Sequence, residues 1–143
     1  FLISKGCDVN IENDGWTALL CAAVDKSDYT DNVKLLIDSG ANIGHANRSG
    51  NTALHLAAMI GCYNIVGLLV IAATNDERKI AIINAVNYKG RTALHLAVMK
   101  GHYDVVTLLL LADVDKNIVD FQNQTALQIA EEKGYDKIVE LLR

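Results

Sequence analysis

The sequence contains no proline, although it has ten glycines among its 143 residues. Turns must therefore be made by glycine, asparagine and aspartate, which tolerate the left-handed backbone conformations that tight turns need. Long apolar runs are also missing. The longest, residues 65–73 and 105–112, are much shorter than the roughly 20 residues that cross a bilayer. We therefore expect no membrane-inserted segment and no secretory signal at the start.

A strong excess of positive charge is absent too. The chain has 13 Lys and Arg residues against 17 Asp and Glu, which gives a formal net charge of -4. Proteins that bind nucleic acid through its phosphates usually carry a basic surface. We therefore expect no direct nucleic-acid binding, although a local basic patch is compatible with this balance.

Cysteine is scarce. Cys7, Cys21 and Cys62 are odd in number and far apart, and there is no CxxC pair. This usage is typical of reduced thiols in an intracellular protein, so we expect a cytoplasmic or nuclear location, or both. A structural disulfide or a zinc site is the alternative interpretation.

Sequence motifs that carry catalysis are missing as well. There is no GxxxxGKS or GxxxxGKT loop, no GxGxxG after a strand, no HExxH and no EF-hand loop. Cys62 and His102 are the candidates for a nucleophile and its base, but such a pair also needs a third, orienting group. We therefore expect a non-enzymatic protein with no cofactor, no metal and no small-molecule substrate.

What the sequence does contain is an internal repeat. "NTALHLAAMIGCYNIVGLL" at 51–69 and "RTALHLAVMKGHYDVVTLL" at 91–109 agree at most positions. Thr-Ala-Leu occurs four times, at intervals of 35, 40 and 33 residues, and periods of this size indicate stacked supersecondary units. The tripeptides begin at Thr17, Thr52, Thr92 and Thr125.

Each unit predicts two helices. Thr opens the first helix as an N-cap, and in the last unit Gln128 completes a capping box with Thr125. Gly61, Gly101 and Gly134 are expected to end the first helices. A second apolar helix follows, and an Asn- and Asp-rich segment leads to the next unit as a β-hairpin-like turn. One helix pair cannot bury its own apolar face, so the units must stack into an all-α solenoid.

The pattern G-x-T-A-L-H-x-A-x-x-x-G-x-x-x-V-x-x-L-L resembles the ankyrin repeat, and the resemblance covers essentially the whole chain. Ala replaces the family's usual Pro after Thr in every unit. The resemblance implies a stack of helix-turn-helix repeats that binds proteins. It also implies that His55 and His95 serve the helix starts, where we expect them to bond near the Thr hydroxyl and the adjoining turn.

The chain is expected to be a single ankyrin-repeat domain over residues 1–143, and to form part of a longer array or multidomain protein. Its expected units are a leading fragment, 1–14, and repeats at 15–49, 50–89, 90–122 and 123–143. In this family, asparagines placed like Asn10, Asn84 and Asn117 bond the turn and can be hydroxylated.

The second unit has extra residues, and the charged stretch 75–79 should protrude as a longer second helix or as a loop. A tolerated surface insertion and a partner-contacting projection are both open interpretations. This long interval also resembles repeats of IκB-like proteins, a weaker likeness that implies a Rel-type transcription factor as partner. The alternatives are a targeting or scaffold domain of a larger protein, such as an enzyme, a channel or a pathogen effector, and a passive spacer.

The resemblance places partners on the concave side, over the hairpin tips and the first helices. Three aromatic residues, Trp16, Tyr88 and Phe121, are expected along one edge, either as binding residues or packed on neighbouring tips. Met59, Ile60 and Met99 should make the groove apolar. The N-terminal end should be acidic and the centre basic. The candidate binding residues are Trp16, Arg48, Ser49, Asn51, Met59, Ile60, Tyr88, Lys89, Arg91, Met99, Lys100, Phe121, Gln122 and Gln124.

Overall fold

The computed structural model describes residues 10–25 and 29–143. The predictions for Cys7 and for residues 1–9 of the leading fragment lie outside the described residues. So do Asp8 and Asp28, two acidic residues of the N-terminal end. Within those ranges the chain forms nine helices and no strand. They are α1 (Ala18–Val24), α2 (Thr30–Asp38), α3 (Ala53–Ile60), α4 (Tyr63–Thr74), α5 (Lys79–Ile83), α6 (Ala93–Met99), α7 (Tyr103–Leu111), α8 (Ala126–Lys133) and α9 (Asp136–Leu142).

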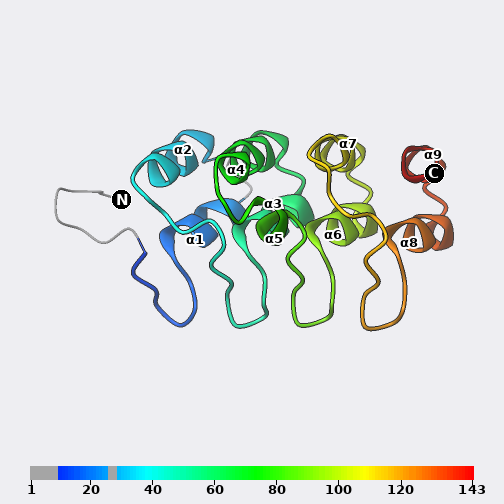
Figure 1. Cartoon of the computed structure of the whole chain (residues 1–143), viewed down its shortest axis with the longest axis horizontal. Helices are drawn as coiled ribbons and strands as arrows, with labels where there is room; N and C mark the ends of the chain where they lie inside the picture. The colour runs from blue at the N-terminus through cyan, green and yellow to red at the C-terminus, as the bar shows by residue number, and fades with distance from the viewer. Residues whose placement is uncertain (1–9, 26–28) are drawn as a thin grey trace.

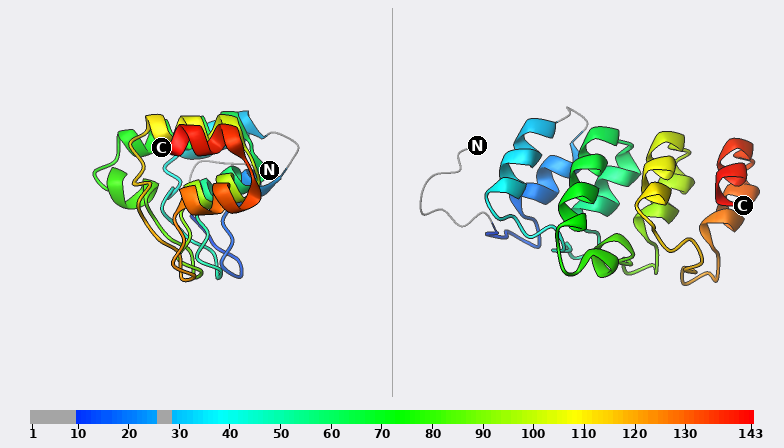
Figure 2. Two further views of the ribbon diagram at one scale, coloured as in Figure 1. Left: turned by 90° about the vertical axis from the view of Figure 1, so that its right-hand side faces the viewer. Right: turned by 45° about the horizontal axis from the view of Figure 1, so that its top comes forward.

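The helices form two layers with long loops projecting from one side (Figure 1). The inner layer consists of α1, α3, α6 and α8, and the outer layer consists of α2, α4, α7 and α9. Seen along the stack, the four loops lie in register below the helices (Figure 2). We call residues 10–16, 45–51, 85–91 and 118–124 the hairpin loops. The prediction of an all-α solenoid with hairpin-like connections is confirmed.

Each inner helix begins at the expected threonine. Thr17, Thr52, Thr92 and Thr125 have extended backbones, and each accepts a bond from the backbone N–H three residues later. The capping box predicted at Thr125 and Gln128 is present. His55 and His95 complete two more boxes by the same geometry. A cap of this kind stabilises a helix by about 1 kcal/mol.

The inner helices end close to the expected glycines. Gly61 and Gly134 are left-handed C-caps of α3 and α8. In α6 the C-cap is Lys100, and the left-handed residue Gly101 follows it. A left-handed residue suits glycine because a side chain there would crowd the backbone.

The core runs through all four helix pairs. Ala57, Ala97 and Ala130 are 0% exposed and allow neighbouring inner helices to approach closely. Val33, Val66 and Val106 line the buried side of the outer helices. Each large apolar side chain buried in this way contributes roughly 1.5–3 kcal/mol, so stacking supplies most of the driving force for folding.

The insertion in the second repeat gives a longer second helix, as one of the two expectations had it, and adds a further short helix that was not expected. Helix α4 does continue to Thr74, but the chain then turns and forms the short helix α5. Ile82 and Ile83 of α5 are buried, so this helix is anchored to the stack. The turn is held by Asp76, whose Oδ1 accepts the Arg78 backbone N–H at 2.8 Å. Most of the charged stretch 75–79 forms this turn, and the apolar residues after it explain why the chain then packs on the stack as α5.

Candidate partner-binding surface

Each of the last three hairpin loops is built around one buried polar side chain. Asn47 Oδ1 accepts the backbone N–H groups of Ser49 at 2.9 Å and Asn51 at 3.1 Å. Asn87 bonds Lys89 and Arg91 in the same way. Asp120 takes this place in the last loop and bonds Gln122 and Gln124. These bonds fix the tips before any partner arrives.

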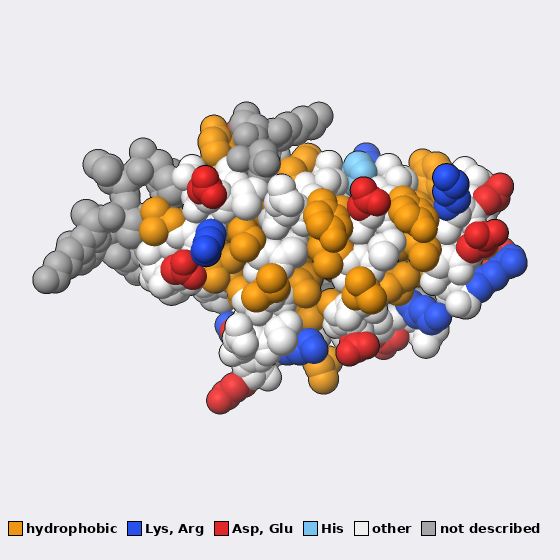
Figure 3. All heavy atoms as spheres, turned by 90° about the horizontal axis from the view of Figure 1, so that it is seen from above, with side chains coloured by type: hydrophobic (Ala, Val, Ile, Leu, Met, Phe, Trp, Pro, Cys, Tyr) orange, Lys and Arg blue, Asp and Glu red, His pale blue; other side chains and the backbone are white. Residues whose placement is uncertain are grey.

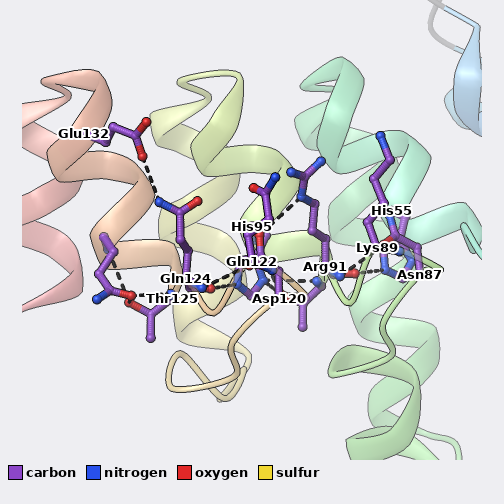
Figure 4. A network of polar contacts seen from close by, with 12 residues as sticks. His55, Asn87, Lys89, Arg91, His95, Asp120, Gln122, Gln124, Thr125 and Glu132 are labelled. Atoms are coloured by element: carbon purple, nitrogen blue, oxygen red, sulfur yellow. Dashed lines mark hydrogen bonds and ion pairs between the residues drawn. The ribbon is translucent and has the colours of Figure 1, made fainter.

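Side chains at the loop bases join consecutive repeats (Figure 4). Asn87 Nδ2 donates to Asn51 Oδ1 at 2.9 Å. Between the third and fourth repeats the equivalent contact is an ion pair, in which Arg91 Nε lies 3.5 Å from Asp120 Oδ2. The Arg91 side chain is 16% exposed and that of Asp120 is 1% exposed. Asn51 and Arg91 were expected on the binding surface, but both are engaged in holding the stack.

Asp120 remains ionised through its contacts. Burial alone would raise the pKa of this carboxyl, but the N–H groups of Gln124 and Gln122, with Arg91, outweigh burial and hold the pKa below its usual value. The pair cannot be predicted when each position is considered separately. A comparison of equivalent positions does reveal it. Asp120 stands where the two preceding loops have Asn, and Arg91 stands where the preceding loop has Asn51.

His55 and His95 bridge the repeats from their capping positions (Figure 4). His55 Nδ1 accepts the Thr52 N–H at 3.2 Å, so its Nε2–H donates to the Arg91 carbonyl at 2.9 Å. The corresponding Nε2 bond of His95 reaches the Gln124 carbonyl at 3.1 Å. Burial lowers the pKa of both imidazoles, so both are neutral at neutral pH. The predicted role at the helix start is confirmed.

Tyr88 and Phe121 occupy equivalent tip positions and are 70% and 77% exposed. Each ring lies beside the turn glycine of the preceding loop. A Cβ on Gly50 would lie 2.8 Å from Tyr88 Cδ1, and one on Gly90 would lie 2.6 Å from Phe121 Cδ1. The Tyr88 N–H also donates to the Ser49 carbonyl at 3.1 Å. The two rings are therefore packed on neighbouring tips and at the same time open to a partner.

Trp16 does not continue this aromatic edge. It follows the turn glycine Gly15, whereas Tyr88 and Phe121 precede the turn residue by two positions. Its side chain is partly buried and packs against the core. Arg48 takes the equivalent tip position, with its Cγ 3.1 Å from where a Cβ on Gly15 would lie. The expected edge of three aromatics is thus an arginine followed by two aromatics.

The first helices expose less apolar surface than expected. Met59 and Met99 are partly buried and pack against the core, and Ile60 is partly buried as well. Among the candidate binding residues, the exposed ones are Arg48, Ser49, Tyr88, Lys89, Lys100, Phe121 and Gln122, and the partly buried ones are Trp16, Asn51, Met59, Ile60, Arg91, Met99 and Gln124. The hairpin tips, more than the helices, carry the accessible side chains.

The centre was expected to be basic because of Arg48, Lys89, Arg91 and Lys100. Two of these four cations form ion pairs within the chain. Arg48 Nη2 lies 2.6 Å from Asp14 Oδ1 across two neighbouring tips. Arg91 is paired with Asp120. The expected contrast between an acidic end and a basic centre is therefore smaller than the sequence indicates. Lys89 and Lys100 remain as exposed cations outside these pairs.

Of the candidate nucleophile and base, Cys62 and His102, the histidine bonds the backbone of the preceding repeat. The His102 ring lies against Gly61, where a Cβ would be 2.7 Å from it, and its Nε2 is 3.0 Å from the Met59 carbonyl. Over residues 10–25 and 29–143, no three His, Cys, Asp or Glu side chains are grouped so that they could hold a metal ion. None of the described helices is both long and apolar enough to span a membrane.

Comparison with known proteins agrees with this architecture. The family model described as "Ankyrin repeats (3 copies)" matches residues 1–79, 27–120 and 75–143. Dauer abnormal formation protein 25 of Caenorhabditis elegans is 42% identical over 69 residues, a stretch that covers 47% of this chain and 17% of that protein. The chain thus spans a small part of that relative. The matches extend over all the stacked units, and the chain belongs to the ankyrin-repeat family.

Proposed function

We propose that this chain is a non-catalytic module that binds another protein through its hairpin tips and the adjoining inner helices. Ankyrin repeats are protein-interaction modules, which gives the general role. The observation that supports the hairpin face is the exposure of Tyr88 and Phe121, at 70% and 77%, on rigid tips. Aromatic side chains of this kind are frequent energetic centres of protein interfaces.

Rigidity strengthens the proposal. The Tyr88 N–H bonds the Ser49 carbonyl, and the Phe121 N–H bonds the Lys89 carbonyl at 3.0 Å. Because the tips are already ordered, they lose little conformational entropy when a partner binds. Lys89 and Lys100 favour a partner segment that is acidic or polar over the middle repeats, and such charges accelerate encounter more than they increase affinity.

Neither Cys21 nor Cys62 is joined in a disulfide, and the Cys21 side chain is exposed. An exposed free thiol fits a reducing compartment, so we place this function inside the cell, in the cytoplasm, the nucleus or both.

A Rel-type transcription factor is the narrower partner hypothesis. It rests on the insertion, which includes α5, and on common repeat residues around it. A targeting or scaffold role within a larger enzyme, channel or pathogen effector uses the same surface with a different partner. A passive spacer would use no surface at all. Incubation with a purified Rel-type dimerisation domain tests the narrower hypothesis separately from the general one.

Affinity capture from a cell lysate tests the general proposal. We compare the parent chain with the double variant Tyr88→Ala/Phe121→Ala. The matched control is Ile80→Ala/Leu35→Ala, which removes exposed apolar side chains at 76% and 52% exposure from α5 and α2. Circular dichroism confirms that all three proteins fold.

We expect a protein that the parent and the control retain and the hairpin variant loses. Equal retention by all three proteins would show that the hairpin face is not the binding site. The absence of any specifically retained protein would favour the spacer.

A further inference from the structure

The exposed side of the outer helices changes in character along the stack. On this side α4 carries Tyr63, Gly67 and Ile71, and α7 carries Tyr103, Thr107 and Leu111 at the same positions of the repeat. The middle residue of each row, Gly67 or Thr107, is partly buried, and the others are exposed. Tyr63 and Ile71 are 51% and 63% exposed, and Tyr103 and Leu111 are 44% and 78% exposed. We call these four side chains the outer apolar patch.

The flanking repeats carry charges at the equivalent positions. Lys34 and Asp38 of α2 correspond to Gly67 and Ile71, and Asp136 and Glu140 of α9 correspond to Tyr63 and Gly67. Seen from above, apolar side chains lie across the middle of this face with one acidic side chain among them, and most charged side chains lie toward the two ends (Figure 3). An apolar centre with a charged rim is the usual anatomy of a protein interface.

The outer apolar patch lies outside the buried core. Its four side chains are exposed, and none of them belongs to the core cluster. Gly67, between Tyr63 and Ile71, is not required by internal packing either, since a Cβ there would meet only Leu108 Cδ2 at an ordinary 3.8 Å. Glycine inside a helix costs about 1 kcal/mol relative to alanine. A surface glycine of this kind permits close approach by another molecule.

From this pattern we infer that the outer apolar patch is a dimer interface that binds a second copy of the chain. Two orientations of the two-fold axis would bring the outer helices of two copies face to face, and charge complementarity decides between them. If the axis runs parallel to the helices, between α4 and α7, then α4 lies against α7 of the second copy and α2 lies against its α9. Lys34 then faces Glu140 of the second copy, twice by symmetry, while Gly67 faces Thr107. A two-fold axis along the stack would instead set Lys34 against Lys34 and Glu140 against Glu140.

The other positions of the interface also match in this arrangement. Ile71 faces Leu111, and Tyr63 faces Tyr103, so apolar groups meet apolar groups. Lys34 and Glu140 are exposed, and neither forms an ion pair with another described residue. This surface lies on the side opposite the hairpin loops (Figure 1), so the inference does not depend on the proposed function, and a dimer leaves both hairpin faces open.

Sedimentation velocity over a concentration series tests the inference with the whole chain. We expect a monomer–dimer equilibrium for the parent chain. In Ile71→Glu/Leu111→Glu the equilibrium should shift to monomer, with a dissociation constant at least tenfold larger. Ile80→Glu is the matched control, since Ile80 is 76% exposed on α5, outside the outer apolar patch, and it should dimerise like the parent. A parent that stays monomeric throughout, or a patch variant that dimerises like the parent, would overturn the inference.

Charge exchange tests the orientation and does not depend on altering the patch. Lys34→Glu and Glu140→Lys should each weaken the dimer, because each places like charges opposite one another. The double variant Lys34→Glu/Glu140→Lys should restore it. If the double variant is as weak as the single ones, the proposed two-fold arrangement is wrong. Circular dichroism of every variant confirms that the change lies in association and not in folding.

Discussion

The hairpin face and the outer-helix face differ in how much of their exposed side-chain surface the fold itself uses. Phe121 and Leu111 illustrate this, because they are 77% and 78% exposed. The Phe121 ring contacts Gly90 of the preceding repeat, whereas Leu111 lies outside the core and its packed neighbours. Two side chains with equal exposure can therefore differ in how much their substitution destabilises the fold. On the hairpin face one residue can hold the stack and present a binding group together.

The largest expected loss of stability comes from replacing a turn glycine. Comparing two glycines separates the cost of overpacking from the cost of backbone strain. Gly90 and Gly134 have the same left-handed φ of 73–74°, but a Cβ on Gly90 would lie 2.6 Å from Phe121 Cδ1, while one on Gly134 would meet nothing within 4 Å. Gly134→Ala should cost roughly 1–2 kcal/mol from backbone strain alone. Gly90→Ala should cost roughly 2–4 kcal/mol, because overpacking adds to that strain.

Urea denaturation of both glycine variants gives the two free energies of unfolding. Equal losses would show that the contact between neighbouring tips contributes nothing to stability.

The next effect concerns the ion pair at the base of the last hairpin loop. Arg91→Ala leaves the Asp120 carboxylate, 1% exposed, without its cation, and should destabilise the chain by roughly 1–3 kcal/mol. The double variant Arg91→Asn/Asp120→Asn recreates the Asn51–Asn87 pair of the previous junction and should recover most of this loss. Chemical denaturation of the single and double variants checks the prediction. A double variant less stable than Arg91→Ala would contradict it.

A pH effect should arise on the hairpin side from the two bridging histidines. Burial lowers the pKa of His55 and His95 below the ordinary 6.5, so the unfolded chain takes up protons first as the pH falls. Their contribution is intact above about pH 6.5 and should be lost below it, by at most about 1.4 kcal/mol per pH unit for each histidine.

Glutamine provides a control for the histidines from within the chain, since Gln128 already completes the capping box of α8. The double variant His55→Gln/His95→Gln should lose most of the slope of unfolding free energy between about pH 6.5 and 5. A slope unchanged from the parent would place the pH dependence elsewhere.

The smallest expected effect compares the two equally exposed side chains directly. Phe121→Ala should lower the free energy of unfolding by about 0.5–1 kcal/mol, because it removes the contact with Gly90. Leu111→Ala should change it by less than about 0.5 kcal/mol. Thermal and urea denaturation of the monomer, at low protein concentration, measure both. A Leu111→Ala loss as large as that of Phe121→Ala would remove the distinction between the two faces.

Local signals made the stack predictable from sequence. Thr52 as a cap and Gly61 as a terminator act within a few residues of themselves, so their roles could be read without knowing the fold. Helix α5 could not be predicted, because its formation depends on Ile82 and Ile83 finding a buried place between distant segments. The Arg91–Asp120 pair joins residues 29 positions apart, and only a comparison of equivalent positions reveals it.

Amide hydrogen exchange of the chain, alone and with a captured partner, tests the central claim most directly. The claim is that the hairpin face binds a partner while the outer helices remain free for a second copy. We predict new protection at residues 48–51, 88–91 and 121–124 on addition of the partner, with residues 63–74 and 103–111 unchanged. Protection confined to 63–74 and 103–111 would contradict the claim and assign the outer apolar patch to that partner.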